Sequence, residues 1–179
     1  METRLYFVAL VPDPVVEQQV HAFKADLSDR FGTKAAMKSP AHITLFSPFR
    51  FSGNEQALFA ALQEAANGMS AFPVKLENFD SFPPRVIFVD VHENELLMKL
   101  QRKVKTVFLG AVKETKAAKD DFHPHMTIGN RDWSDGAFDD AWNEYRAKKF
   151  SASFTANRIT LLRLDGAKWN VISEAPLTA

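Results

Sequence analysis

The stretch HPHMTIGN, residues 123–130, repeats a pattern that occurs earlier in the chain at PAHITLF, residues 40–46. Residues two apart in a β-strand point to the same face, so each segment would present an imidazole and a hydroxyl together. The aliphatic residues between and after them would point into the core. The aligned tetrads, each reading histidine, any residue, threonine and an aliphatic residue, begin at His42 with Thr44 and at His125 with Thr127.

The elements around these two strands recur in the same order. We expect strand, helix, strand, helix, strand over about residues 3–80 and again over about residues 84–164, followed by a terminal hairpin over about residues 157–175. Two similar lobes related by a pseudo-twofold axis would bring the matching strands face to face, with a cleft between them. The length predicts one bilobal domain over residues 1–179.

Local signals place several individual elements. Asp13 and Pro14 predict the start of a helix that runs to about Phe31. SPFRFSG, after the first motif, is typical of a loop, and DGAFDDAWNEYRAKKF of a helix. The lysine-rich segment KETKAAKDD is expected to be an exposed loop.

Composition excludes several classes of function. Twenty-two basic side chains balance twenty-two acidic ones, so any nucleic acid would have to be recognised locally. Cysteine is absent, which excludes disulfides, thiolate zinc sites and a cysteine nucleophile. The first residues lack the features of a signal peptide, and no apolar stretch is long enough to span a bilayer. We expect a cytoplasmic protein with no membrane partner.

Two histidines, each beside a threonine, suit in-line displacement at phosphorus. One neutral imidazole would take a proton from the attacking water or hydroxyl, while the other, protonated, would deliver one to the leaving oxygen. The threonine hydroxyls could donate to the non-bridging oxygens. This chemistry requires no metal and no cofactor. The near symmetry of the two tetrads leaves open which histidine is the acid and which is the base.

The pair HITL and HMTI, together with FVALVPD, RVIFVDV and FHPHMTIGN, resembles the 2H phosphoesterase superfamily, in particular its 2'-5' RNA ligase and cyclic phosphodiesterase branch. The resemblance covers essentially the whole chain. It implies an α+β, bilobal, duplicated fold in which two antiparallel sheets flank a central cleft and helices pack on the outside. It also implies metal-independent hydrolysis of cyclic nucleotide or RNA-end phosphodiesters and, in some members, joining of 2',5' ends without ATP. The implied catalytic residues are His42, Thr44, His125 and Thr127.

Four further residues are candidates for binding substrate, which we expect to be a small cyclic nucleotide or an RNA 3'-end bound by a monomer. His123 shares the face of His125 if the strand continues through the proline between them. Arg131 and Arg50 follow the two motifs at similar intervals and could attract an anion. Phe46 lies two residues after Thr44, so in a regular strand it would point to the same face. It could form a cleft wall on which a base stacks.

Two other readings remain open. A zinc-dependent hydrolase could draw its ligands from His123, His125, His42 and two aspartates, Asp120 and Asp121. A non-catalytic domain that binds nucleotides or RNA ends would show the same histidine and threonine pairs. The physiological substrate is equally open among tRNA-derived ends, a cyclic ADP-ribose phosphate, 2',5'-oligoadenylate and small cyclic nucleotides.

Overall fold

A computed structural model of the chain describes residues 2–112 and 122–178. The lysine-rich segment predicted to be an exposed loop, residues 113–121, lies outside the described residues. In chain order the elements are β1 (Arg4–Leu10), α1 (Pro14–Phe31), the 3-10 helix η1 (Ala35–Lys38), β2 (Ile43–Phe51), α2 (Glu55–Ala66), β3 (Phe72–Phe82), β4 (Val86–Val91), α3 (Glu95–Ala111), β5 (His125–Asn130), α4 (Ala137–Tyr145), β6 (Ser151–Ala156), β7 (Arg158–Asp165) and β8 (Lys168–Pro176).

The strands form two four-stranded antiparallel sheets, ordered β2-β1-β7-β8 and β5-β4-β3-β6. Each sheet has a motif-bearing strand, β2 or β5, at one edge, paired with the strand that precedes it in the chain. The predicted α+β class with two antiparallel sheets is confirmed. The sheets do not coincide with the two sequence halves, because β3 from the first half pairs with β4 and β6 of the second. The division into two pseudo-repeats therefore stays a prediction.

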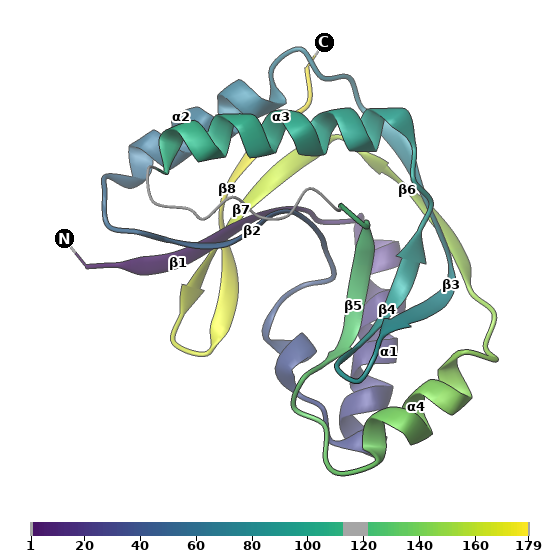
Figure 1. Cartoon of the computed structure of the whole chain (residues 1–179). Helices are drawn as coiled ribbons and strands as arrows, with labels where there is room; N and C mark the ends of the chain where they lie inside the picture. Colours follow the sequence, from purple (N-terminus) through teal and green to yellow (C-terminus); the bar gives the residue numbers. More distant parts are fainter. Residues whose placement is uncertain (1, 113–121, 179) are drawn as a thin grey trace.

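Helices cover the outer faces of the sheets, and α1 packs on the sheet that does not contain the strand preceding it in the chain. Helix α1 follows β1 in the chain yet packs on β5 and β6 of the other sheet, next to α4. Helices α2 and α3 pack together and contact β2, β7 and β8 (Figure 1). This exchange ties the two sheets together, and a large cluster of buried apolar side chains draws on both of them.

Helix α1 forms where the sequence predicts it. The Asp13 side chain accepts a hydrogen bond from the Val16 amide at 3.0 Å, which satisfies one of the free donors at the helix start. Gly32 ends the helix with a left-handed φ of 76°, a conformation that glycine adopts without steric cost. The buried face of the helix contains the aliphatic residues expected of a core helix and also Lys24.

Two predicted boundaries differ from the structure. The segment SPFRF, expected to be a loop, continues β2 to Phe51, which pairs with Arg4 of β1. Pro48 is tolerated there because β2 is an edge strand, where a proline need not donate to a neighbour. The predicted helix over residues 135–150 is shorter, because α4 ends at Tyr145.

A β-bulge follows the threonine of each motif. Thr44 and Phe46 pair with consecutive residues of β1, so Leu45 is an extra residue in β2. Thr127 is followed by the same shift in β5, where Ile128 is the extra residue. The two strands therefore share an irregularity at the same position as well as a sequence motif.

The bulge overturns the prediction that Phe46 forms a wall of the cleft. Because Leu45 is extra, the alternation of faces shifts, and Phe46 points into the core with only 8% of its surface exposed. Its ring packs against Phe49 and Phe108, with centroids 5.4 and 5.7 Å away.

Candidate functional site

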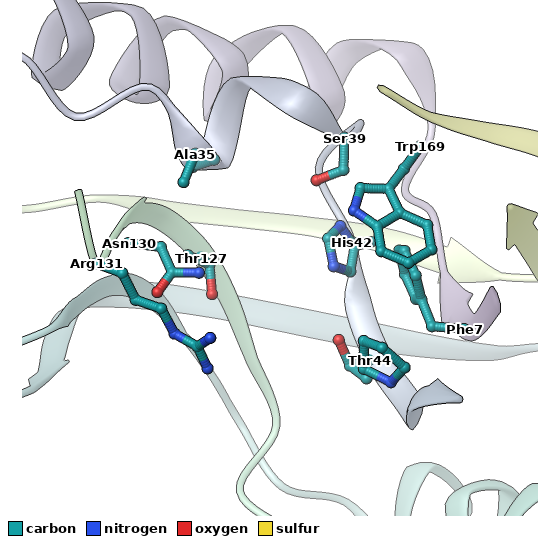
Figure 2. Close-up of a pocket in the computed structure, with 11 residues that line it drawn as sticks. Phe7, Ala35, Ser39, His42, Thr44, Thr127, Asn130, Arg131 and Trp169 are labelled. Atoms are coloured by element: carbon teal, nitrogen blue, oxygen red, sulfur yellow. The ribbon is translucent and has the colours of Figure 1, made fainter. Parts of the chain in front are cut away.

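A cavity of about 360 Å³ brings the two motifs together. Figure 2 shows His42 and Thr44 on one side of it and Thr127 with Arg131 on the other. His125 opens β5, two residues before Thr127, and lies close enough for its charge to act on His42. The remaining lining residues are Phe7, Ala35, Ala36, Ser39, Pro48, Asn130 and Trp169.

Both histidine rings are oriented by the backbone two residues earlier. The Nδ1 atom of His42 lies 2.8 Å from the Pro40 carbonyl oxygen, and Nδ1 of His125 lies 2.7 Å from the His123 carbonyl oxygen. A carbonyl can only accept, so each Nδ1 carries the proton and donates it. In the neutral ring, each Nε2 therefore has no proton and can accept one. Alignment of the motifs places Pro40 over His123, but it does not by itself predict these hydrogen bonds.

Each imidazole also packs against a phenylalanine from the neighbouring strand. The ring of Phe7 in β1 lies 4.8 Å from His42, and that of Phe88 in β4 lies 4.9 Å from His125. Trp169 packs edge-on against Phe7 at 4.7 Å and lines the cavity. Sequence reasoning missed all three residues. For Phe7 and Phe88 a signal was available, because each is followed by a valine at the corresponding place in the two matching strands.

Burial controls the protonation of both histidines. It lowers the pKa of His42 to about 4, and the nearby charges of Lys24 and His125 act in the same direction. Burial also lowers the pKa of His125, and the nearby ring of His123 acts in the same direction. The hydrogen bond to the His123 carbonyl and, with a smaller effect, the carboxylate of Asp90 oppose the shift. Near neutral pH both imidazoles of the free protein are therefore uncharged, and each Nε2 can accept a proton.

Arg131 supplies a positive charge to the cavity. Its backbone is left-handed, with φ at 66°, and its amide donates to the carbonyl of Arg85 at 2.8 Å. A non-glycine residue in this conformation is uncommon and turns the chain sharply at the end of β5. Figure 2 shows its side chain beside Asn130 and Thr127.

The other predicted binding residues lie outside this cavity. The ring of His123 is exposed, and its Nε2 is 3.5 Å from the Asp90 carboxylate. Arg50 lines a separate groove formed with the start of β1 and the turn after β7, where Arg4 and Asp165 also lie. Neither side chain lines the cavity that His42 and Thr127 share.

The described residues bear on two further expectations. Within residues 2–112 and 122–178, no group of three histidine, cysteine, aspartate or glutamate side chains is placed to hold a metal ion. Asp120 and Asp121, two of the zinc ligands considered above, lie outside the described residues. No helix in the described part of the chain is both long and apolar enough to cross a membrane.

Comparison with known proteins gives a consistent family. A family model described as the 2'-5' RNA ligase superfamily matches residues 11–168. Similar solved structures include Escherichia coli LigT complexed with 3'-AMP, with a TM-score of 0.75 and 18% identity, covering 99% of this chain and 100% of that one. A phosphoesterase gives a TM-score of 0.72 at 17% identity, covering 99% and 100%. Usb1 of Kluyveromyces marxianus with uridine monophosphate gives 0.51 at 15%, covering 97% and 98%.

A search of curated proteins gives no match. The solved structures share the fold of this chain at low identity, and the family model spans the elements from α1 to β7. The paired histidine and threonine motifs lie within the matched residues. The chain belongs to the 2'-5' RNA ligase superfamily, among the 2H phosphoesterases.

Proposed function

We propose that this protein is a metal-independent phosphodiesterase that acts on cyclic nucleotides or RNA ends, at a 2',3'-cyclic phosphate or a 2',5' linkage. The observation that carries the proposal is a cavity lined by His42, Thr44 and Thr127, with His125 two residues before Thr127 on the same strand and with the Nδ1 of each imidazole held by a backbone carbonyl. Membership of the family supports a phosphodiesterase-type activity. LigT with 3'-AMP and Usb1 with uridine monophosphate support a nucleotide as the ligand class.

Hydrolysis of a 2',3'-cyclic phosphate would proceed in one displacement. One neutral histidine takes a proton from water through Nε2 as the water oxygen bonds to phosphorus. The opposite bond from phosphorus to a ribose oxygen breaks, and the other histidine donates its Nε2 proton to that oxygen. Thr44 and Thr127 donate hydrogen bonds to the non-bridging oxygens, where charge accumulates. The product is a nucleoside monophosphate, and both histidines have exchanged one proton.

The lowered pKa values add a requirement to this mechanism. In the free protein both histidines favour the uncharged form, yet the acid must carry a proton. A bound phosphodiester brings a negative charge that favours the protonated imidazole. Substrate binding would therefore help to create the protonated histidine that acts as the acid.

With a 5'-hydroxyl in place of water, the same groups could join a 2',5' linkage reversibly.

Turnover of a nucleoside 2',3'-cyclic phosphate tests the proposal directly. We expect the protein to open adenosine or uridine 2',3'-cyclic phosphate, or to cleave a 2',5'-linked dinucleotide, at the same rate with and without EDTA. Chromatography and phosphorus NMR would identify the products. We also expect a bell-shaped dependence of rate on pH, because one histidine must be neutral and the other charged.

The outcomes of these experiments distinguish a metal-independent phosphodiesterase from a zinc-dependent hydrolase and from a non-catalytic binding domain. Loss of activity in EDTA, restored by zinc, would replace this mechanism with metal catalysis. Binding of these phosphodiesters without turnover of any of them would leave a nucleotide-binding domain. A flat profile between about pH 5 and 8 would contradict catalysis by paired histidines.

Arg131→Gly is expected to raise KM for the cyclic phosphate about tenfold to a hundredfold, with a smaller change in kcat. A hydrogen bond to a charged group contributes about 1.5–3 kcal/mol, and glycine tolerates the left-handed backbone at this position. Steady-state kinetics would measure the effect. Arg50→Ala is the matched control, because its groove is separate from the cavity. Equal effects of the two variants would exclude a specific role for Arg131.

A further inference from the structure

Lys24 is a buried cation on α1 that the mechanism above does not use. It is only 1% exposed and shares the inner face of the helix with Val20 and Leu27. Its ammonium donates a hydrogen bond to the carbonyl oxygen of Ser39 at 2.9 Å. Lysine is almost never fully buried unless it is paired, so one neutral hydrogen bond in this place calls for an explanation.

The bond from Lys24 holds the segment that orients His42. Glu17, two turns earlier on α1, accepts a hydrogen bond from the Ala41 amide at 3.2 Å. These two contacts fix the residues on either side of Pro40, whose carbonyl accepts the proton of His42 Nδ1. Helix α1 therefore supports the backbone that sets the direction of the catalytic ring.

The same ammonium makes the surroundings of the two histidines unequal. The titratable groups that act on His42 are Lys24 from α1 and His125 from β5, and both oppose a positive charge on it. Strands β1 and β8 present only the uncharged rings of Phe7 and Trp169 to this site, among the residues described. Arg131, also cationic, lines the same cavity.

The surroundings of His125 are mixed in sign. The neighbouring ring of His123 opposes a positive charge on His125, and the Asp90 carboxylate favours it with a smaller effect. Glu17 favours the charged form of Lys24. Two histidines that the sequence motif makes equivalent therefore differ in one respect: a lysine ammonium acts on His42, and a carboxylate acts on His125.

We propose that Lys24 is a positioning residue that holds the Ser39–Ala41 backbone under His42 and adds to the effect of burial in disfavouring a positive charge on that imidazole. His42 then takes the proton from the nucleophile, and His125 supplies one to the leaving oxygen. The division of roles rests on the proposed phosphodiesterase function. The electrostatic coupling between Lys24 and His42 does not, because it exists in the free protein. Burial lowers the pKa of Lys24 to about 8, which leaves the ammonium charged at neutral pH.

Proton NMR titration of the histidine ring signals tests the coupling without substrate. His42→Gln and His125→Gln variants would assign the two signals. We expect His42 to titrate below His125 in the wild type and its midpoint to rise by about one pH unit in Lys24→Met, because a nearby positive charge is gone. Lys24→Arg keeps the charge and should leave the midpoint close to the wild-type value. Lys99→Met, at an exposed position of α3, is the matched control and should change nothing.

The rate profile of the same variants tests the role. If His42 is the base, the acidic limb of kcat/KM should move to higher pH in Lys24→Met by the same amount as the NMR midpoint. At pH 5 the variant should then be about twofold slower relative to the wild type than at pH 7, because a midpoint that rises from about 4 to about 5 halves the neutral fraction of His42. Lys24→Arg should keep the wild-type limb even if its kcat falls, which a purely structural role for Lys24 would not predict.

The proposal has distinct failures. An unshifted His42 midpoint in folded Lys24→Met, or equal shifts in the Met and Arg variants, would overturn the electrostatic role. If Lys24→Met does not fold, the titration of the wild type still tests the proposal. A His42 midpoint at or above that of His125 would contradict the assignment of His42 as the base. Absence of turnover with every phosphodiester would instead remove the proposed function and leave the measured coupling intact.

Discussion

Replacing His42 or His125 by alanine is expected to lower kcat for a nucleoside 2',3'-cyclic phosphate about 10²- to 10⁴-fold, the range that general acid–base catalysis supplies. Each ring has its Nδ1 bonded to a backbone carbonyl and its Nε2 left to move a proton. The double variant should be little slower than the slower single variant, because acid and base act in one step. Single-turnover and steady-state kinetics would measure these losses.

His123→Ala is the matched control for these variants. Its ring is exposed and lies near Asp90, and its only contact with His125 through a hydrogen bond uses the backbone carbonyl, which alanine retains. We expect a loss of less than about tenfold, far below that of the catalytic pair. A loss for His123→Ala equal to that for His125→Ala, with the fold intact by circular dichroism, would point to a shared role such as metal ligation.

The sequence predicts the two strands that carry the motifs because their signal is periodic. Histidine and threonine two residues apart share a face in any regular strand, so the motif alone indicates that they meet. The same periodicity gives the wrong face for Phe46, because the bulge after Thr44 reverses the alternation of faces. No residue type in the sequence indicates that bulge. The antiparallel sheets followed from the resemblance, whereas the crosswise packing of α1 depends on contacts between distant segments.

The two arginines show why equal spacing in sequence misleads. Strand β2 continues past its motif, and at about 3.3 Å per residue it carries Arg50 more than 20 Å beyond His42. Strand β5 ends at Asn130, and the left-handed Arg131 turns the chain back toward the cavity. Lys24 was missed for another reason. A single lysine in a helix is normally solvated, although its spacing from Val20 places it on the buried face.

Removing the threonine hydroxyls is expected to slow the chemical step without weakening substrate binding greatly. Thr44→Val and Thr127→Val should each lower kcat about 10²-fold, because each hydroxyl would donate to a non-bridging oxygen whose charge grows in the transition state. Valine keeps the branched shape that suits a strand. The bulge that follows each threonine should therefore persist.

Thr44→Ser and Thr127→Ser are the matched controls, since serine keeps the hydroxyl and loses only a methyl group. Each serine variant should recover most of the wild-type kcat, whereas KM should change little across all four variants. If the valine variants raised KM and left kcat unchanged, the hydroxyls would bind the ground state and the transition state equally. In that case the histidines and Arg131 would have to account for the stabilisation of the transition state, and the threonines would serve only to hold the substrate between the two strands.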